Sequence, residues 1–180
     1  MNLLKVCAAV VGVAVLSYIF CRNRKTSSND KSLYDRLGGI YPIAAVVNHF
    51  SDALIDNPIA GKNSKNRYLR DWYANKMLSR LPGLKFMRTL WLASLSGGPF
   101  TYTATVPGKC PFSLENAHSN LQISSEEFDA TAQELYKSLT YFKVPARERD
   151  EVMSAFKAHK GEINMGYDIS HHTKIPNIIC

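Results

Sequence analysis

Apolar residues recur every three or four positions in four stretches of this chain of 180 residues. That spacing places them on one face of a helix, whereas a half-buried strand would alternate apolar and polar residues. No such alternation occurs between residues 32 and 165. The pattern therefore predicts an all-α fold whose helices pack face to face. The four apolar faces consist of Ile43, Val47, Phe50 and Leu54; of Leu84, Met87, Trp91 and Leu95; of Phe128, Ala132, Leu135, Leu139 and Phe142; and of Val152, Phe156 and Ile163.

Capping and turn-forming residues separate these stretches. Ser124 and Glu127 have the spacing of a capping box, so we expect the third helix to begin beside them. A short helix, SLYDRL, is predicted before Gly38-Gly39. Glycine and proline interrupt helices and mark the remaining ends. These ends are Pro42 and residues 56–58 around the first helix, residues 97–99 after the second, and Val144-Pro145 before the fourth, which is expected to fray near Gly161.

The composition fits one globular domain with additions at its ends. Hydrophobic residues make up 46% of the chain and charged residues 21%, which excludes a collagen, a coiled-coil rod and a mostly disordered protein. The 4 cysteines are too few for a scaffold built on disulfides. We expect an anchor or signal segment at 1–21, a polar linker at 22–31, a helical domain at 32–165 and a C-terminal tail at 166–180.

The N-terminal stretch LLKVCAAVVGVAVLSYIFC, residues 3–21, has the length and apolarity of a transmembrane helix. Lys5 is its one charged residue, and its long side chain can reach the membrane interface. Arg22, Arg24 and Lys25 follow, and their excess over Lys5 favours a single-pass anchor with a cytoplasmic domain. The alternative is a cleaved secretory signal, which would place the domain outside the cytoplasm, in an exported or periplasmic location.

Positive charge is concentrated in residues 62–88, which carry eight basic residues against Asp71 alone, in a chain of net charge +7. Such a segment is either a solvated loop or a surface for anionic lipid, an acidic protein or an anionic ligand. A basic stretch by itself is not a nucleic-acid-binding module, so we expect no nucleic-acid partner.

Two residues stand out as candidates for function. Arg88 lies four residues after Leu84 and three before Trp91, which places a guanidinium on the apolar face of the second helix. Burying this cation without a partner is costly, so it either extends to the surface or meets an anion. His118 lies in the run SLENAHSNLQIS, and the pattern leaves open whether it is a core residue or a ligand to the iron of a buried cofactor.

Six separated strings together resemble the truncated haemoglobins of the first group. The glycine pairs at 38–39 and 97–98 are similar to that family's glycine signatures, and His118 followed by Ile123 is similar to its proximal-histidine segment. The string FKVPARE resembles a bacterial subset, many of whose members carry an N-terminal hydrophobic export or anchor segment. The strings are SLYDRLGG (32–39), AAVVNHF (44–50), DNP (56–58), LSGGPFTYT (95–103), ENAHSNLQIS (115–124) and FKVPARERDEV (142–152).

The resemblance implies a shortened globin in which two helix pairs sandwich haem b. It implies that His118 is the proximal ligand of the haem iron, with its other ring nitrogen held by a backbone carbonyl or a nearby side chain. The remaining haem-contacting residues that it implies are Phe50, Ser51, Leu84, Arg88 and Trp91 on the distal wall and Leu114 near His118.

The chain also departs from the family pattern. Many members place Tyr directly after the residue that Phe50 matches, where this chain has Ser51, and many place Gln at the position of Arg88. We expect Arg88, if it turns inward, to replace the missing hydrogen bonds to a bound gas, and otherwise to pair with a haem propionate. The chain is also longer than usual between Asn57-Pro58 and Gly97-Gly98, through a basic insertion at 59–83.

The implied function is reversible binding of a diatomic gas, O2 and also NO or CO, for transport or sensing. The alternative is a nitric oxide dioxygenase or a peroxidase-like enzyme. Because the chain has no flavin or nicotinamide motif, such an enzyme would need a separate reductase. A third possibility is a haem-free helical membrane protein in which His118 is a core residue.

Overall fold

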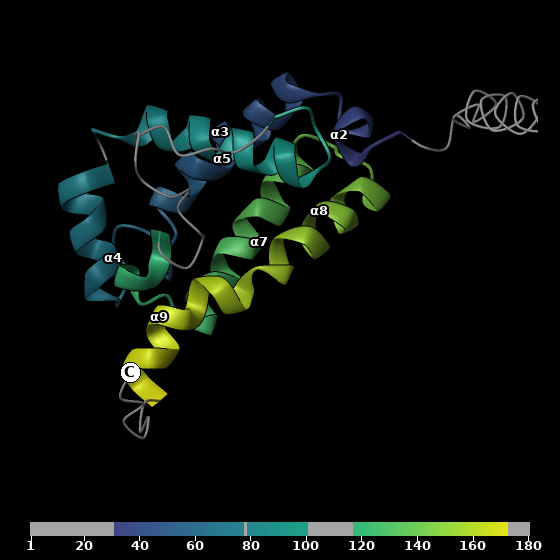
Figure 1. Ribbon diagram of the computed structural model, residues 1–180. Coiled ribbons are helices and arrows are strands. Elements are labelled where there is room, and N and C mark those ends of the chain that lie inside the picture. Colours follow the sequence, from purple (N-terminus) through teal and green to yellow (C-terminus); the bar gives the residue numbers. More distant parts are fainter. Residues whose placement is uncertain (1–30, 78, 101–116, 173–180) are drawn as a thin grey trace, which may run out of the picture. The chain divides into compact units, whose positions relative to one another are not determined.

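The computed structural model describes residues 31–77, 79–100 and 117–172 (Figure 1). No strand occurs in these ranges, which confirms the predicted all-α class. The helices are α2 (Leu33–Arg36), α3 (Ile40–Ile55), α4 (Arg67–Trp72), α5 (Leu81–Leu95), α7 (Ser125–Tyr141), α8 (Ala146–Ala158) and α9 (Lys160–His172), with a π-helical turn η1 (Tyr73–Met77) and a 3-10 turn η2 (Ser119–Leu121).

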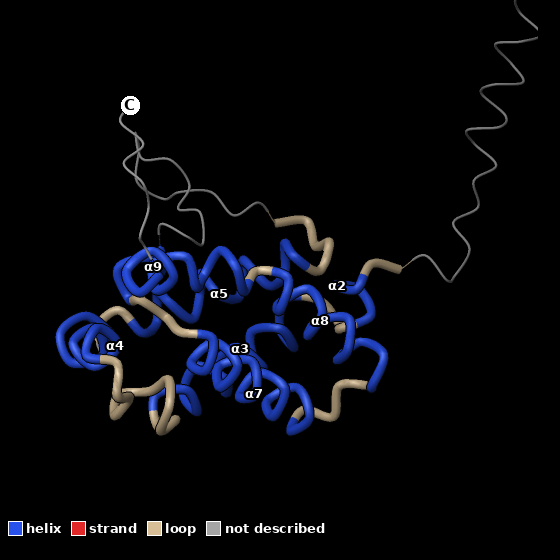
Figure 2. The backbone as a smooth tube through the Cα atoms, turned by 90° about the horizontal axis from the view of Figure 1, so that it is seen from below, coloured by secondary structure: helices blue, strands red, loops and turns tan. Residues whose placement is uncertain are grey.

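The central helix is α3, which packs against both α5 and α7, while α7 also packs against α8 and α9 (Figures 1 and 2). The predicted apolar faces of α3 and α7 meet in one core. The face of α5 was predicted less well, because Leu92 and Ala93 enter the core, Trp91 and Leu95 are only partly buried against it, and Leu84 and Met87 lie outside it. Within it Phe128 stacks on Phe156 with 5.3 Å between ring centroids, and Ala93 of α5 is completely buried. Two residues differ from the faces predicted for them. Phe142 lies just after α7 and is half-exposed, and Ile163 belongs to α9 rather than to α8.

The sequence signals at the helix ends have the predicted effect at α7. The Ser124 hydroxyl accepts from the backbone N–H of Glu127, and the Glu127 carboxylate accepts from the backbone N–H of Ser124 at 2.8 Å. The first long helix begins earlier than predicted, at Ile40, so Pro42 lies inside its first turn, where a missing N–H costs nothing. Gly38-Gly39 precede it with φ angles of 89° and 84°, which only glycine adopts readily.

The C-terminal region differs from the prediction. The last predicted helix does not fray near Gly161, because α8 ends at Ala158 and a separate helix, α9, runs on to His172. Residues 166–172 are therefore helical, although the tail was expected to begin at 166. Ile163 and Asn164 are buried, and α9 packs against α7 and η2. Tertiary packing of this kind stabilises a helix whose own periodicity is weak.

The basic insertion contains a helix that sequence analysis did not predict. The side-chain oxygen of Asn66 caps α4 by accepting from the backbone N–H of Tyr68 at 2.9 Å. Leu69 and Tyr73, one turn apart, are each 5% exposed. The insertion is thus not wholly a solvated loop, because one edge of α4 and η1 is buried.

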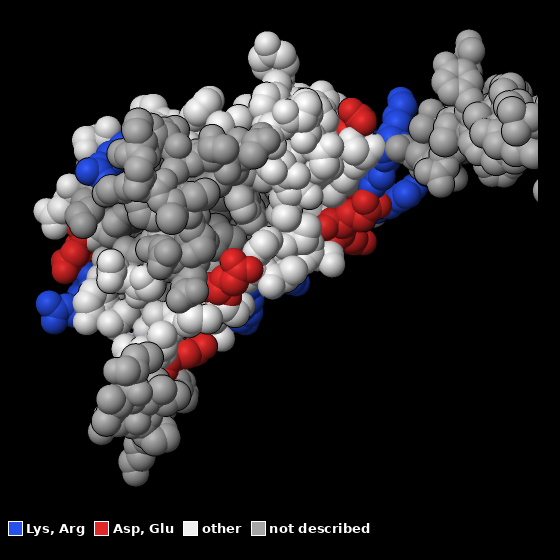
Figure 3. Space-filling model, viewed as in Figure 1, with Lys and Arg blue, Asp and Glu red and all other residues white. Residues whose placement is uncertain are grey.

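Part of the charge of the basic segment is neutralised within the domain. Lys62 pairs with Asp56 at 2.7 Å and Lys85 pairs with Asp52 at 2.6 Å. The Arg70 guanidinium donates to two backbone carbonyls of the preceding turn, at 2.7 and 2.8 Å. On the face in Figure 3 the basic side chains lie in small separate groups rather than in one continuous patch.

Several sequence predictions lie outside the described residues. They include the anchor or signal segment at 3–21, the linker at 22–30, Leu114 and the last residues of the tail, 173–180. Among the residues that are described, no helix has both the length and the apolarity needed to cross a membrane. The predicted membrane anchor stays a prediction.

Candidate functional site

Arg88 extends from α5 toward the inner face of α3. Its Nη1 donates to the Ser51 hydroxyl at 3.0 Å, and its guanidinium carbon lies 5.5 Å from the centre of the Phe50 ring. Ser51 is fully buried and Phe50 is 6% exposed. The guanidinium is therefore directed between the two helices, and three of the residues predicted for the site lie together.

Among the described residues, the guanidinium of Arg88 has no negatively charged partner. In the described part of the chain, no carboxylate lies within ion-pair distance of Arg88. Burial lowers the pKa of Arg88 from its ordinary value, and the electrostatic influence of Tyr73 opposes that change. Burial likewise raises the pKa of the Tyr73 phenol, and Arg88 opposes that increase. Guanidinium stays protonated in proteins, so the site contains a cation.

The other predicted residues of α5 have different neighbours. Trp91 packs edge-on against Phe156 of α8, with 6.2 Å between centroids, and against His159, with 5.4 Å. Leu84 is partly buried in the first turn of the helix. Trp91 therefore closes the α5–α8 side of the core, while Arg88 reaches toward α3.

His49 precedes Phe50 on α3 but belongs to a different contact. Its Nδ1 lies 2.9 Å from the Ser138 hydroxyl of α7, and its ring stacks on Tyr141 with 4.4 Å between centroids. This imidazole is used in the packing of α3 on α7 and is not part of the Arg88 group.

His118 lies directly before η2 and is partly buried. The turn ends at Gln122, which has a left-handed backbone with φ of 45°. On its other side η2 packs against α9, where Gly166 lies so close to Ser119 that a Cβ atom would overlap the Ser119 backbone. The position of His118 is thus fixed by a close helix contact.

Asn66 connects the insertion to the segment that follows His118. Its side-chain amide donates to the backbone carbonyls of Leu121 and Gln122 at 3.0 and 3.1 Å, and to the Glu127 carboxylate at 3.2 Å. The Glu127 carboxylate is buried and also accepts from the Ser124 hydroxyl at 2.9 Å. A buried carboxylate needs such partners, so this network holds α4, η2 and the start of α7 together.

Sequence analysis missed both Asn66 and Tyr73. Asn66 has a local signal, because asparagine before a short run with apolar residues three and seven positions on is typical of a helix start. Its bonds to η2 have no local signal, since they join residues 55 and 56 positions apart. Tyr73 lies among charged residues, and only its burial marks it out.

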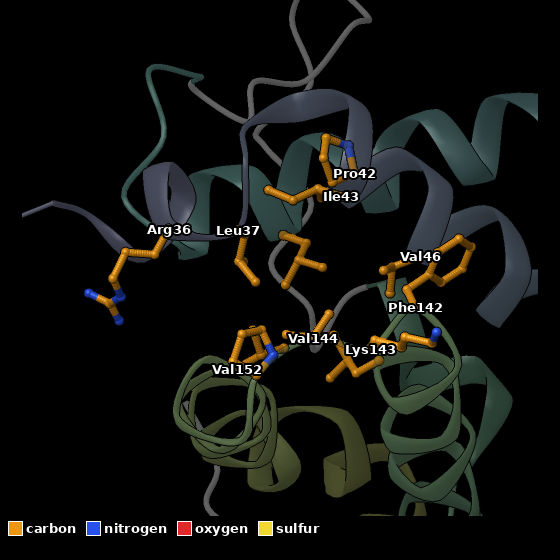
Figure 4. A pocket seen from close by; sticks show the side chains of 12 residues that line it. Arg36, Leu37, Pro42, Ile43, Val46, Phe142, Lys143, Val144 and Val152 are labelled. Carbon is orange, nitrogen blue, oxygen red and sulfur yellow. The ribbon is translucent and has the colours of Figure 1, made fainter.

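A cavity of about 210 Å³ lies elsewhere, between α2, α3 and the turn from α7 to α8 (Figure 4). Its lining is mostly apolar and includes Ile43, Val46 and Val152, with Arg36 and Lys143 also contributing. None of the predicted site residues lines it. This cavity is therefore separate from the group around Arg88.

Two-layer packing of α3 and α5 against α7 and α8 is the arrangement of a shortened globin. The sequence profile of the bacterial-like globins matches residues 32–165, and the chain belongs to this family. No curated protein matches the chain.

Solved structures share this fold. The truncated hemoglobin from Tetrahymena pyriformis, in its Fe(III) form, is 20% identical with a TM-score of 0.58, and the match covers 74% of this chain and 97% of that one. The 2/2 hemoglobin from Synechococcus sp. PCC 7002, in the cyanomet state with covalently attached heme, is 22% identical with a TM-score of 0.57, covering 75% and 99%. At these identities the likeness shows the fold alone.

Proposed function

We propose that this chain binds haem b through the imidazole of His118 and reversibly holds a diatomic gas, O2 and also NO or CO, beside Arg88. The observation that carries the proposal is the Arg88 guanidinium, directed at buried Ser51 with no carboxylate near it in the described residues. Membership of the bacterial-like globin family supports the choice of haem.

The chemistry of these side chains fits the cofactor. A cation withdrawn from water is stabilised by an anion or by an electron-rich atom that accepts its hydrogen bonds. Haem bound here would supply two propionate carboxylates and an iron with a coordination position for a gas. The half-buried imidazole of His118 is a nitrogen donor of the kind that haem iron takes from globins.

The residues of the chain then have distinct roles on the distal side. Phe50 and Leu84 present apolar surface that excludes water and so strengthens nearby hydrogen bonds. Arg88 donates toward the gas, and its bond to Ser51 orients the guanidinium. A bound O2 carries more negative charge than CO, so these donors slow the release of O2 more than that of CO.

On the proximal side, Asn66 and Gly166 hold the turn that follows His118. Asn66 fixes the backbone at residues 121–122, and Gly166 allows α9 to press on Ser119. Both contacts restrict the path of the chain at the imidazole, which favours a single ligand geometry. Leu114 remains the proposed apolar contact near His118.

An optical spectrum of the purified protein tests the proposal directly. Wild type should take up haem and give a Soret band that shifts when the iron is reduced and exposed to CO. His118→Ala should lose haem or give an altered ferrous spectrum, whereas His171→Ala, at an exposed position of α9, should match wild type. A colourless wild type, or a His118→Ala spectrum identical to wild type, would refute it.

A second candidate is an enzyme that uses the held O2, such as a nitric oxide dioxygenase. The inward Arg88 favours it, because slow O2 release gives NO time to react. Each turnover would need one electron from a separate reductase. Stopped-flow mixing with NO separates the two functions: an enzyme turns over repeatedly when a reductase and its nicotinamide donor are added, and a gas carrier does not.

A further inference from the structure

The cavity between α2, α3 and the turn from α7 to α8 has an apolar interior that reaches the core. Ile43, Val46 and Val152 line it, and each of them is at most 5% exposed. Its volume of about 210 Å³ exceeds the roughly 150 Å³ of a dry apolar cavity that takes up benzene, but it is smaller than a site for a drug-sized molecule. The space therefore suits a short acyl chain.

Two cations lie at the rim of this cavity, and they differ in their partners. The Arg36 guanidinium donates to the carboxylates of Glu148, at 3.0 Å, and of Glu151. In the described part of the chain, no carboxylate lies within ion-pair distance of the Lys143 ammonium. Figure 4 shows the charged ends of Arg36 and Lys143 on opposite sides of the apolar side chains. The carboxylates that bind Arg36 thus leave the charge of Lys143 uncompensated.

Lys143 occupies a backbone position that favours glycine. Its φ of 55° lies in the left-handed region, where a residue with a Cβ atom is strained. The Lys143 N–H donates to the Thr140 carbonyl at 2.9 Å, and the next N–H, of Val144, donates to the Leu139 carbonyl at 3.0 Å. These two bonds form a Schellman motif, in which glycine is the usual residue at the position of Lys143. The backbone conformation therefore does not account for the lysine, whose side chain places a charge at the cavity mouth.

We propose that this cavity binds the anion of a medium-chain carboxylic acid, with its acyl chain among the apolar side chains and its carboxylate paired with Lys143. The chain gains free energy by leaving water, and the ammonium donates charge-assisted hydrogen bonds to the carboxylate. The flexible stem of lysine lets the ammonium follow a headgroup at the mouth. The site is separate from the Arg88 group and needs no haem, so the inference does not depend on the proposed function.

Both parts of the ligand contribute to this mode of binding, and each part has its own signature. Each methylene group withdrawn from water strengthens binding about three- to fourfold, so octanoate should bind about tenfold more tightly than hexanoate. A lysine that only pairs with anions at the surface would give no dependence on chain length. Octanol has the same chain without the charge, so its affinity should not depend on Lys143.

The test is a titration of the full chain with octanoate, hexanoate and octanol at low salt, followed by the methyl resonances of Val46 and Val152. Octanoate should shift both resonances. Lys143→Met should weaken octanoate binding about three- to tenfold and leave octanol binding unchanged, because an exposed ion pair is lost. Lys157→Met is the matched control and should bind as wild type does. Lys157 is exposed on α8, does not line the cavity and forms no ion pair within the described ranges.

Lys143→Gly separates binding from folding. Glycine relieves the left-handed strain, so this variant should unfold at the wild-type temperature or higher, while its affinity for octanoate falls as in Lys143→Met. Octanoate that shifts neither valine, equal affinities for octanoate and hexanoate, or wild-type affinity in both Lys143 variants would overturn the inference. Binding to vesicles of phosphatidylglycerol without binding of free octanoate would also overturn it, since that result indicates a membrane surface in place of a cavity site.

Discussion

Gly166 of α9 lies directly against the backbone of Ser119, the residue after His118. There is no room at this contact for a side chain, because a Cβ atom on Gly166 would overlap both the α-carbon and the carbonyl of Ser119. The path of the chain at the proposed iron ligand thus depends on residue 166 having no side chain beyond a hydrogen atom. This residue lies in a helix more than forty positions further along the sequence.

Gly166→Ala should destabilise the protein by about 1–3 kcal/mol, because an overpacked contact must move one of two backbones. The displaced backbone adjoins His118, so the same variant should lose haem faster than wild type. Thermal unfolding and transfer of haem to apomyoglobin measure the two effects.

Gly161→Ala is the matched control on the same helix. A Cβ atom at Gly161 meets nothing within 4 Å, and alanine favours helix over glycine. This variant should be as stable as wild type or more stable. Equal stability of the two alanine variants would contradict the close contact at Ser119.

Asn66→Ala should lose both the cap of α4 and the bonds to the turn after His118. We expect unfolding to be easier by about 2–3 kcal/mol, since a helix cap and partners of a buried carboxylate are lost together. Ser32→Ala removes an exposed cap at α2 and should cost less. Chemical denaturation of both variants gives the comparison, and a smaller loss for Asn66→Ala would contradict the network.

Arg88→Met should speed O2 release about ten- to a hundredfold and change CO release much less, because a charged donor to the gas is lost. Lys85→Met removes a cation one turn earlier on α5, where Lys85 pairs outward with Asp52 and Asn48. That variant should release O2 at the wild-type rate. If both variants behave alike, general surface charge and not the inward guanidinium controls the gas.

Glu151 should stabilise the fold only at higher pH. Burial acts to raise the pKa of this carboxyl, but hydrogen bonds from Arg36 and Arg147, together with their charges, lower it overall. A lowered pKa in the folded state means stabilisation above the pKa of the unfolded chain, which disappears as the pH falls through the folded value. Wild type should therefore exceed Glu151→Gln in thermal stability near pH 7, and this difference should shrink steadily as the pH falls below the ordinary pKa of a glutamate.

The exposed neighbour Asp150 supplies the control for this comparison. It forms no ion pair in the described part of the chain, so Asp150→Asn should show a much smaller dependence on pH. High salt should also narrow the gap between wild type and Glu151→Gln, because exposed ion pairs are screened. A gap between wild type and Glu151→Gln that does not shrink as the solution is acidified would contradict the assignment.

The parts of the fold that the sequence predicts are those with local signals. The apolar faces of α3 and α7 and the capping box at Ser124 need only neighbouring residues to be recognised. Arg88 was recognisable for the same reason, because a cation on an apolar face has few ways to be accommodated.

The parts that the sequence does not predict depend on distant partners. The burial of α4 comes from contacts such as Asn66 with Glu127, 61 positions apart. The helical state of residues 166–172 likewise relies on η2 and α7, against which α9 packs. Tyr73 has no pattern of its own, and its burial emerges only when α4 is folded against the domain.

The carboxylate of Glu127 receives hydrogen bonds from its own helix cap and from the insertion at once. Excising residues 59–83 would therefore not return a minimal globin, since it would strip a buried anion of donors that the rest of the domain does not replace. A shortened protein should therefore first have Glu127 replaced by glutamine, because a neutral amide is less costly to bury than a carboxylate when the donors from the insertion are removed.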